Sequence, residues 1–473
     1  MRRRFNAFPW GLAATGLLLS LAIACGAAAA PTEQPEMAET APKIETQKAA
    51  TPLSETIRNE PAAVPQPTVM PVASVDTNRS LPESLPTDTV AATVPADPAP
   101  TASPTAVPDP TRGEVGGEPD WARELRLAGI ATGIWETYFS KHSVPYSEIF
   151  SGGVPRDGIP PIDEPRFVSV EEANEWLEDK EPVIALEIDG EARAYPLQIL
   201  TWHEIANDTL AGVPVSVTFC PLCNSAIVFD RRLDGEVYDF GVSGNLRNSD
   251  LIMWDRQTQS WWQQLTGEAI VGQLTGAQLD ILPATLTAWQ DFMVTYPDAQ
   301  VLSRDTGHHR SYGANPYAGY DEVGRSPFLF FGQEDDRLLP MERVAAVTIG
   351  GESAAFPFAS LESEGVAHHS LGGQDLVVFF KPGARSALDQ RSIADSREVG
   401  STAIFLRDLD GQLLTFDPDG DEFVDRETGT RWNIFGQGLL GTHAGKRLTP
   451  VEHANHFWFA WAAFRPDTTV VRE

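Results

Sequence analysis

An internal repeat constrains the fold of this chain more than any other feature. Residues 184–196 (IALEIDGEARAYP) align without a gap with residues 345–357 (AAVTIGGESAAFP), at an offset of 161. Further similar motifs follow in the same order as far as the tryptophans at 289 and 458. An ungapped internal match that continues in the same order along the chain is the signature of a repeat architecture. We therefore expect a tandem duplication whose two halves share one fold.

Each half shows the same coarse order of predicted elements. Two strands around a glycine-containing turn lead into a short helix, which covers 196–205 in the first half. A central strand, several short strands and a terminal helix over 288–296 follow. Strands outnumber helices and the turns have hairpin spacing, so the sequence predicts an α+β fold with mainly antiparallel strands. The expected boundaries are 119–181 for an entry segment, 182–304 for repeat one, 305–340 for an inter-repeat loop and 341–473 for repeat two.

The N-terminal region resembles a bacterial lipoprotein signal. Three arginines and an apolar run over 11–23 precede Cys25, so residues 1–25 predict a signal whose cysteine is lipidated. A plain signal peptide or an uncleaved anchor is the alternative. Residues 26–118 are rich in Pro, Ala and Thr and contain no aromatic residue, which predicts a disordered tether. We expect an extracytoplasmic protein held at the cell membrane by a lipid anchor.

Charge and cysteine content narrow the function. The chain has 66 acidic and 35 basic residues, a balance that argues against nucleic acid as a partner, and no protein partner is indicated. Apart from Cys25, the only cysteines are Cys220 and Cys223, in a loop between two predicted strands. Repeat two has Lys381 and Ala384 at the corresponding positions. We therefore expect thiol chemistry in repeat one, a structural role for repeat two, and the main polar cavity beside Cys220 rather than Lys381.

Two histidines are candidate partners of the thiols. His203 stands seventeen residues before Cys220, on the predicted short helix, and His308 lies in the glycine-rich inter-repeat loop. Two thiolates with an imidazole suit copper or zinc, so Cys220, Cys223, His203 and His308 are the predicted metal ligands. The alternatives are a core-packed His203 and a solvated His308.

A polar segment after a predicted strand is a candidate ligand-binding loop. An arginine can hold a carboxylate or phosphate through two hydrogen bonds, and short polar side chains can read a polar ligand. Turn formation explains the same composition. We expect the site to lie within 202–250 and residues 307–317 to cover it. The predicted ligand-binding residues are Ser243, Asn245, Arg247 and Asn248.

Several motifs together resemble the bacterial and archaeal family known as domain of unknown function 3179. They are TWHEIANDT (201–209), TFCPLCNS (218–225), FGVSGNLRNSD (240–250) and YGANPY (312–317), and the resemblance extends over about 182–464. It implies a homologous architecture and an exported location, but no assigned activity.

Three functions are compatible with the sequence. The first is a tethered protein that binds copper or zinc through the thiols and His203. The second is an enzyme or redox protein in which Cys220 is the reactive thiol and His203 lowers its pKa. The third is a structural or adhesion module in which Cys220 and Cys223 form a small disulfide.

Overall fold

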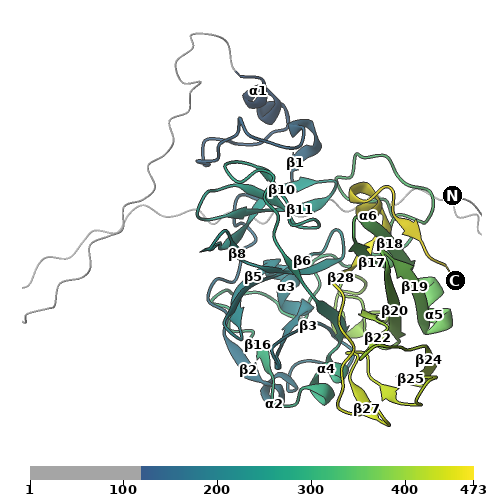
Figure 1. Cartoon of the computed structure of the whole chain (residues 1–473). Helices are drawn as coiled ribbons and strands as arrows, with labels where there is room; N and C mark the ends of the chain where they lie inside the picture. The colour runs from purple at the N-terminus through teal and green to yellow at the C-terminus, as the bar shows by residue number, and fades with distance from the viewer. Residues whose placement is uncertain (1–118, 473) are drawn as a thin grey trace, which may run out of the picture. The chain divides into compact units, whose positions relative to one another are not determined.

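Antiparallel sheets dominate the computed structural model of the chain, which describes residues 119–472 (Figure 1). The helices are short, so the predicted α+β class with mainly antiparallel strands is confirmed. The predicted signal with Cys25 and the predicted tether over 26–118 lie outside the described residues. Among the helices of residues 119–472, none has the length and apolar character needed to span a membrane.

The segment before repeat one contributes edge strands to two sheets. In its second helix Ser169 accepts a hydrogen bond from the Glu172 backbone N–H, and the Glu172 carboxylate accepts one from the Ser169 N–H. This capping box explains why the helix begins there. The elements are α1 (Asp120–Leu127), the 3₁₀ helix η1 (Tyr146–Glu148), β1 (Ile149–Ser151), β2 (Phe167–Ser169) and α2 (Val170–Ala173).

The first half forms three larger sheets, with the strand orders β15-β3-β4-β16-β2, β14-β7-β6-β5 and β1-β10-β11-β12-β13. All ladders within them are antiparallel except that between β16 and β4. The elements are β3 (Pro182–Ile188), β4 (Glu191–Pro196), α3 (Leu197–His203), β5 (Ile205–Leu210), β6 (Val213–Cys220), β7 (Ser225–Asp230), β8 (Arg232–Leu233), β9 (Glu236–Val237), β10 (Phe240–Arg247), β11 (Asp250–Asp255), β12 (Trp261–Gln263), β13 (Ala269–Val271), β14 (Ile281–Leu282), β15 (Ala284–Ala288), α4 (Trp289–Thr295) and β16 (Gln300–Leu302).

The second half has the sheet orders β28-β17-β18-β29, β19-β20-β21 and β24-β25-β26-β27. Its one parallel ladder among the described strands joins β18 and β29, the counterparts of β4 and β16. The elements are β17 (Arg343–Ile349), β18 (Glu352–Pro357), α5 (Phe358–Glu364), β19 (Val366–Leu371), β20 (Gln374–Lys381), η2 (Ile393–Asp395), β21 (Ser401–Leu406), β22 (Asp408–Leu409), β23 (Gln412–Leu413), β24 (Phe416–Asp419), β25 (Glu422–Asp425), β26 (Arg431–Trp432), β27 (Gly438–Leu440), β28 (His453–Phe457), α6 (Trp458–Phe464) and β29 (Thr469–Val470).

Corresponding elements of the two halves have matching bounds. β17, β18, α5, β19 and β20 each begin and end 161 residues after β3, β4, α3, β5 and β6. The Trp262 indole N–H donates to Asp255 at 2.9 Å, and that of Trp432 donates to Asp425 at the same distance. These correspondences support the predicted duplication. Superposition of the halves would test it, and the duplication and its domain boundaries stay predictions.

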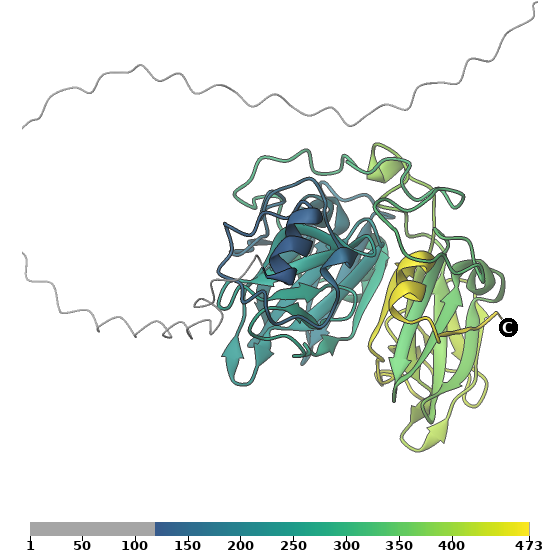
Figure 2. The ribbon, with the colours of Figure 1, turned by 90° about the horizontal axis from the view of Figure 1, so that it is seen from above.

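The two halves lie side by side (Figure 2), and buried side chains of both contribute to common hydrophobic clusters. Trp458, at the start of α6 in the second half, belongs to the same buried cluster as Phe219 and Trp262 of the first half. Conversely, Trp289 of α4 in the first half belongs to a cluster with Phe379 of the second half. Side chains from the terminal helix of each half therefore belong to a buried cluster that includes residues of the other half.

Candidate metal centre

Cys220 and Cys223 lie in the turn that connects β6 to β7. β6 ends at Cys220 because Pro221 has no backbone N–H for the ladder. Cys220 is paired with Ser225, and the Cys223 N–H donates to the Cys220 carbonyl at 3.3 Å. The tight turn therefore holds both thiols at one end of the β6–β7 hairpin, between two strands as the sequence predicted.

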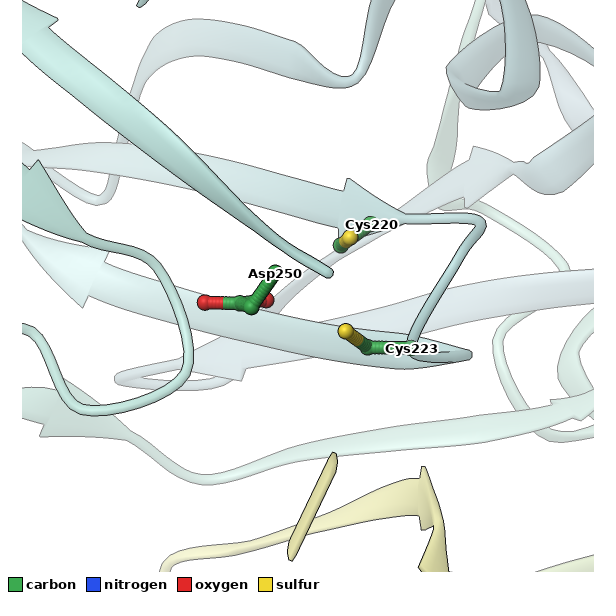
Figure 3. Close-up of side chains that lie close together, drawn as sticks. All are labelled: Cys220, Cys223 and Asp250. Carbon is green, nitrogen blue, oxygen red and sulfur yellow. The ribbon is translucent and has the colours of Figure 1, made fainter. Parts of the chain in front are cut away.

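Asp250 approaches the thiols from a second hairpin. It opens β11 directly after a two-residue turn, Asn248–Ser249, where φ is 51° and 64°. Positive φ at both central positions is the conformation of a type I′ hairpin turn. One ligand atom from each of Cys220, Cys223 and Asp250 lies within 4.8 Å of the other two (Figure 3). This trio, which we call the thiol–carboxylate group, unites three side chains from two hairpins.

The Asp250 carboxylate is fixed through one oxygen only. Its Oδ2 accepts hydrogen bonds from Gln263 Nε2 at 2.6 Å and from the Leu265 backbone N–H at 2.9 Å. Its Oδ1 is buried and accepts no hydrogen bond from an N–H or O–H group. The neighbouring thiols of Cys220 and Cys223 are the groups that interact with this carboxylate on the side of the site. A buried polar atom without a partner carries a free-energy cost unless something else satisfies it. The geometry therefore leaves one carboxylate oxygen available to an ion beside the thiols.

The group is shielded from solvent and holds its protons tightly. The exposed fraction is 1% for Cys220, 0% for Cys223 and 0% for Asp250. Burial raises the pKa of both thiols and raises the pKa of Asp250 to about 6. Both cysteines are free thiols in the structure. The structural-module alternative requires a disulfide between these cysteines, and this arrangement has none. The enzyme alternative requires a thiol with a lowered pKa, and here burial raises the pKa of both thiols.

A fourth acid lies near the group. Glu204 follows α3, is 6% exposed, and has a pKa raised to about 8 by burial. The Tyr317 hydroxyl donates to Glu204 Oε1 at 3.5 Å, so the inter-repeat segment contacts this acid. Among the described residues, no arginine or lysine is one of the groups that most affect the pKa values of these four acids.

His203 and His308 lie beside each other but not in the thiol–carboxylate group. His203 Nδ1 lies 2.7 Å from the Pro160 carbonyl oxygen, and its Nε2 lies 2.7 Å from the Tyr312 hydroxyl. The rings of His203 and His308 are 5.5 Å apart. Because both ring nitrogens of His203 are engaged elsewhere, the structure groups Asp250, rather than either histidine, with the two thiols.

Two of the four predicted ligand-binding residues, Ser243 and Arg247, use their side-chain polar groups within the chain. Ser243, Asn245 and Arg247 belong to β10 rather than to a loop, and only Asn248 lies in the turn. The Ser243 hydroxyl donates to the Ile252 carbonyl at 2.5 Å, and Arg247 pairs with Glu148 at 2.7 Å. The sequence prediction of a free polar loop is therefore corrected to a bulged strand whose side chains stabilise the sheet.

The expected polar cavity beside Cys220 is also corrected. A cavity of about 390 Å³ lies beside Lys381, and neither cysteine lines it. There Lys381 Nζ pairs with Asp291 Oδ1 at 2.5 Å. The thiols are instead packed beneath neighbouring side chains, so the thiol–carboxylate group suits an ion better than a molecule.

Sequence reasoning missed Asp250 as a member of the thiol–carboxylate group and Glu204 as a buried acid of the same region. Asp250 stood at the end of the 240–250 motif, and Glu204 stood next to His203. Asp250 has no characteristic metal-ligand spacing from the cysteines because a separate hairpin brings it to them, whereas Glu204 directly precedes β5, which pairs with β6. The only available signal was their position inside the motifs that carry the family resemblance.

The fold and the site define a class: mainly antiparallel β proteins with a buried thiol–carboxylate group. The chain belongs to the family described as "Protein of unknown function (DUF3179)", which matches residues 156–468. Neither a curated protein nor a solved structure matches this chain.

Proposed function

We propose that this protein binds a zinc ion through Cys220, Cys223 and Asp250. The observation that carries the proposal is the buried grouping of two free thiols with an Asp250 carboxylate whose Oδ1 accepts from no N–H or O–H donor. Deprotonation of several buried acids is unfavourable unless a compensating charge accompanies it. A bound cation supplies that charge and also satisfies the free oxygen.

The donor set favours zinc over copper. Zinc accepts both thiolate and carboxylate ligands in proteins, whereas copper(I) is selected by soft sulfur ligands and gains little from a carboxylate. Copper(I) held by the two thiols alone is the competing possibility, and a titration with both metals separates them.

Burial argues against an enzyme that uses Cys220 as a nucleophile. Reactive cysteines are partly exposed and have a lowered pKa. Cys220 is 1% exposed and burial raises its pKa. His203, which was expected to lower the pKa of this thiol, is bound to Pro160 and Tyr312 instead. Metal binding is therefore the better supported function.

The N-terminal sequence supports a location for this activity. The basic start, the apolar run and Cys25 support export and attachment to the cell membrane through a lipid on that cysteine. A mass spectrum of the mature N-terminal peptide tests this proposal. A peptide that retains residues before Cys25, or that carries no lipid, would contradict it.

The experiment for the metal is a competition titration. Full-length protein, reduced and stripped of metal, is titrated with Zn²⁺ and with Cu⁺ in the presence of a chromogenic chelator. We expect one zinc per chain, and Cys220→Ser, Cys223→Ser and Asp250→Asn should each weaken binding. Asp255→Asn, which changes a buried aspartate at the other end of β11, is the matched control and should bind zinc as the wild type does. Equal affinities for Asp250→Asn and the wild type would contradict the proposal.

A further inference from the structure

We propose that a cavity between the two halves binds a linear amino carboxylate, a small molecule with a carboxylate at one end and an amine at the other. His456 and Arg465 bind the carboxylate. Asp280 and Glu452 bind the amine. The cavity has a volume of about 330 Å³, within the range of small-molecule sites. No member of the thiol–carboxylate group lines it, so this inference is independent of the proposed zinc site.

Both halves contribute to the walls of the cavity. Side chains alternate between the two faces of a strand, so Glu452, Ala454 and His456 project from one face at β28. Ala454 pairs with Ala346 of β17, and these two small side chains leave space between the polar ends. Glu452 and His456 are about 13 Å apart along the strand, too far for the adjacent charged groups of an α-amino acid. The aliphatic lining residues that belong to one buried cluster are Ile227, Leu265, Leu279, Ala346 and Ala454.

The carboxylate end is built around Trp461. The His456 imidazole stacks on the Trp461 ring at 5.2 Å, and Cζ of Arg465 lies 6.0 Å from the centre of a ring of Trp461. His456 is 1% exposed, and neither of its ring nitrogens has a hydrogen-bond partner among residues 119–472. A buried polar group without a partner carries a free-energy cost, which a ligand that hydrogen-bonds to it removes.

The charges at this end suit a single carboxylate. Burial lowers the pKa of His456 to about 3, so its ring is neutral near pH 7 and offers one N–H donor. Arg465 forms no ion pair with any acid of residues 119–472, and its side chain donates to the Phe464 carbonyl at 3.0 Å. Burial lowers the pKa of Arg465, and the charge of Glu268 offsets this only in part. A carboxylate is the planar partner that a guanidinium binds through two hydrogen bonds.

A corresponding cavity shows that the fold does not require an unpaired arginine there. It has a volume of about 400 Å³, and Glu187, Tyr296 and Arg447 line it. Arg447 pairs with Glu187, whose carboxylate also accepts from the Tyr296 hydroxyl at 2.6 Å. Tyr296 follows α4 as Arg465 follows α6, and Glu187 of β3 corresponds to Thr348 of β17. The polar groups of that cavity satisfy one another, whereas Arg465 has a threonine where its counterpart has an acid.

The amine end has two acids. Asp280 and Glu452 line the cavity, and neither forms an ion pair within the described part of the chain. Burial and the charge of Asp280 raise the pKa of Glu452, and a bound ammonium group would offset that repulsion. Two carboxylates and one guanidinium leave the lining with one net negative charge. An amino carboxylate therefore suits the cavity better than a plain carboxylate, and the aliphatic residues suit the methylene chain between its ends.

The experiment is a calorimetric titration of the full-length protein with 6-aminohexanoate, hexanoate and hexylamine at pH 7. We expect one 6-aminohexanoate per chain and weaker binding of the two compounds that lack one charged group. Arg465→Gln should weaken the binding of 6-aminohexanoate and hexanoate about tenfold or more, the usual effect of losing a hydrogen bond to a charged group, and leave hexylamine unchanged. Arg123→Gln, which changes an exposed arginine of α1, is the matched control and should bind all three as the wild type does.

The amine end has its own test. Asp280→Asn combined with Glu452→Gln should weaken 6-aminohexanoate and hexylamine but not hexanoate, and both residues are exposed, so the variant should fold. Absence of 6-aminohexanoate binding to the wild type, or wild-type affinity in Arg465→Gln, would overturn the proposal. If Arg465→Gln unfolds, the three probes on the wild type still decide, because hexanoate or hexylamine binding as tightly as 6-aminohexanoate would refute it.

Discussion

Replacement of Glu204 by glutamine should remove a pH-dependent loss of stability from the metal-free protein. Burial raises the pKa of Glu204 from 4.5 to about 8, so the folded state binds its proton more tightly than the unfolded state. This contribution to stability is fully present below pH 4.5 and is lost as the pH rises through about 8. Glutamine keeps the shape of the protonated side chain but does not ionise.

The expected magnitude follows from the difference in bound protons. Between the two pKa values the folded state holds about one more proton at this residue, and the free energy of unfolding falls by about 1.4 kcal/mol per pH unit. From pH 6 to pH 8 the loss is therefore about 3 kcal/mol at most. Asp250, whose pKa is about 6, loses its own contribution mainly below this interval.

Urea unfolding in the presence of a chelator, at pH 6, 7 and 8, measures this effect. We expect the wild type to lose stability across the series relative to Glu204→Gln. The exposed Glu364→Gln variant should follow the wild type, since its carboxylate is in solvent in both states. Added zinc should reverse the trend, because metal ligands must be deprotonated and the ion binds better at higher pH.

Parallel stability curves for the wild type and Glu204→Gln between pH 6 and pH 8 would refute the reasoning. Such a result would mean that water reaches the carboxyl group and that its pKa is close to that of an exposed glutamate. A fall of equal size in Glu364→Gln and Glu204→Gln would likewise assign the effect to other residues.

Three further predictions concern side chains around the site. Lys381→Ala should lower the free energy of unfolding by about 3–5 kcal/mol, because it leaves the buried Asp291 carboxylate unpaired; urea unfolding measures the loss, and adding Asp291→Ala should restore part of it. His203→Ala should cost about 1–3 kcal/mol through lost hydrogen bonds but bind zinc with unchanged stoichiometry, and loss of zinc in the titration would reinstate this histidine as a ligand. Trp262→Phe should cost at least about 1–3 kcal/mol, since the buried Asp255 loses a donor, and a thermal midpoint equal to that of the wild type would contradict this.

Much of the fold could be read from the sequence. Alternation of apolar and polar residues over 215–220 and the proline that follows indicated a strand ending at a loop, and β6 ends at Cys220. The offset of 161 residues indicated which elements of the two halves correspond, as far as β6 and β20. Periodicity and turn residues are local properties, so they are visible in the order of the residues.

The composition of the site could be read only in part. The cysteine pair was evident because its two members are three residues apart and the second half lacks them. The sequence favoured His203 as the third ligand because it precedes Cys220 on a neighbouring element, but the Pro160 carbonyl and Tyr312 hydroxyl bind its ring. Hydrogen bonds to residues 43 and 109 positions away decide the orientation of that ring, and no local pattern records them.

The sequence by itself determined the strand order along the chain, the family, and the half that carries the thiols. Only the tertiary structure decided which carboxylate joins them. Asp250 reaches the thiols because two hairpins from different sheets meet there, and Glu204 has a positive-φ backbone that its counterpart Gly365 adopts without strain. Packing between sheets and backbone dihedral angles depend on the whole fold, so residue types and spacings alone did not reveal them.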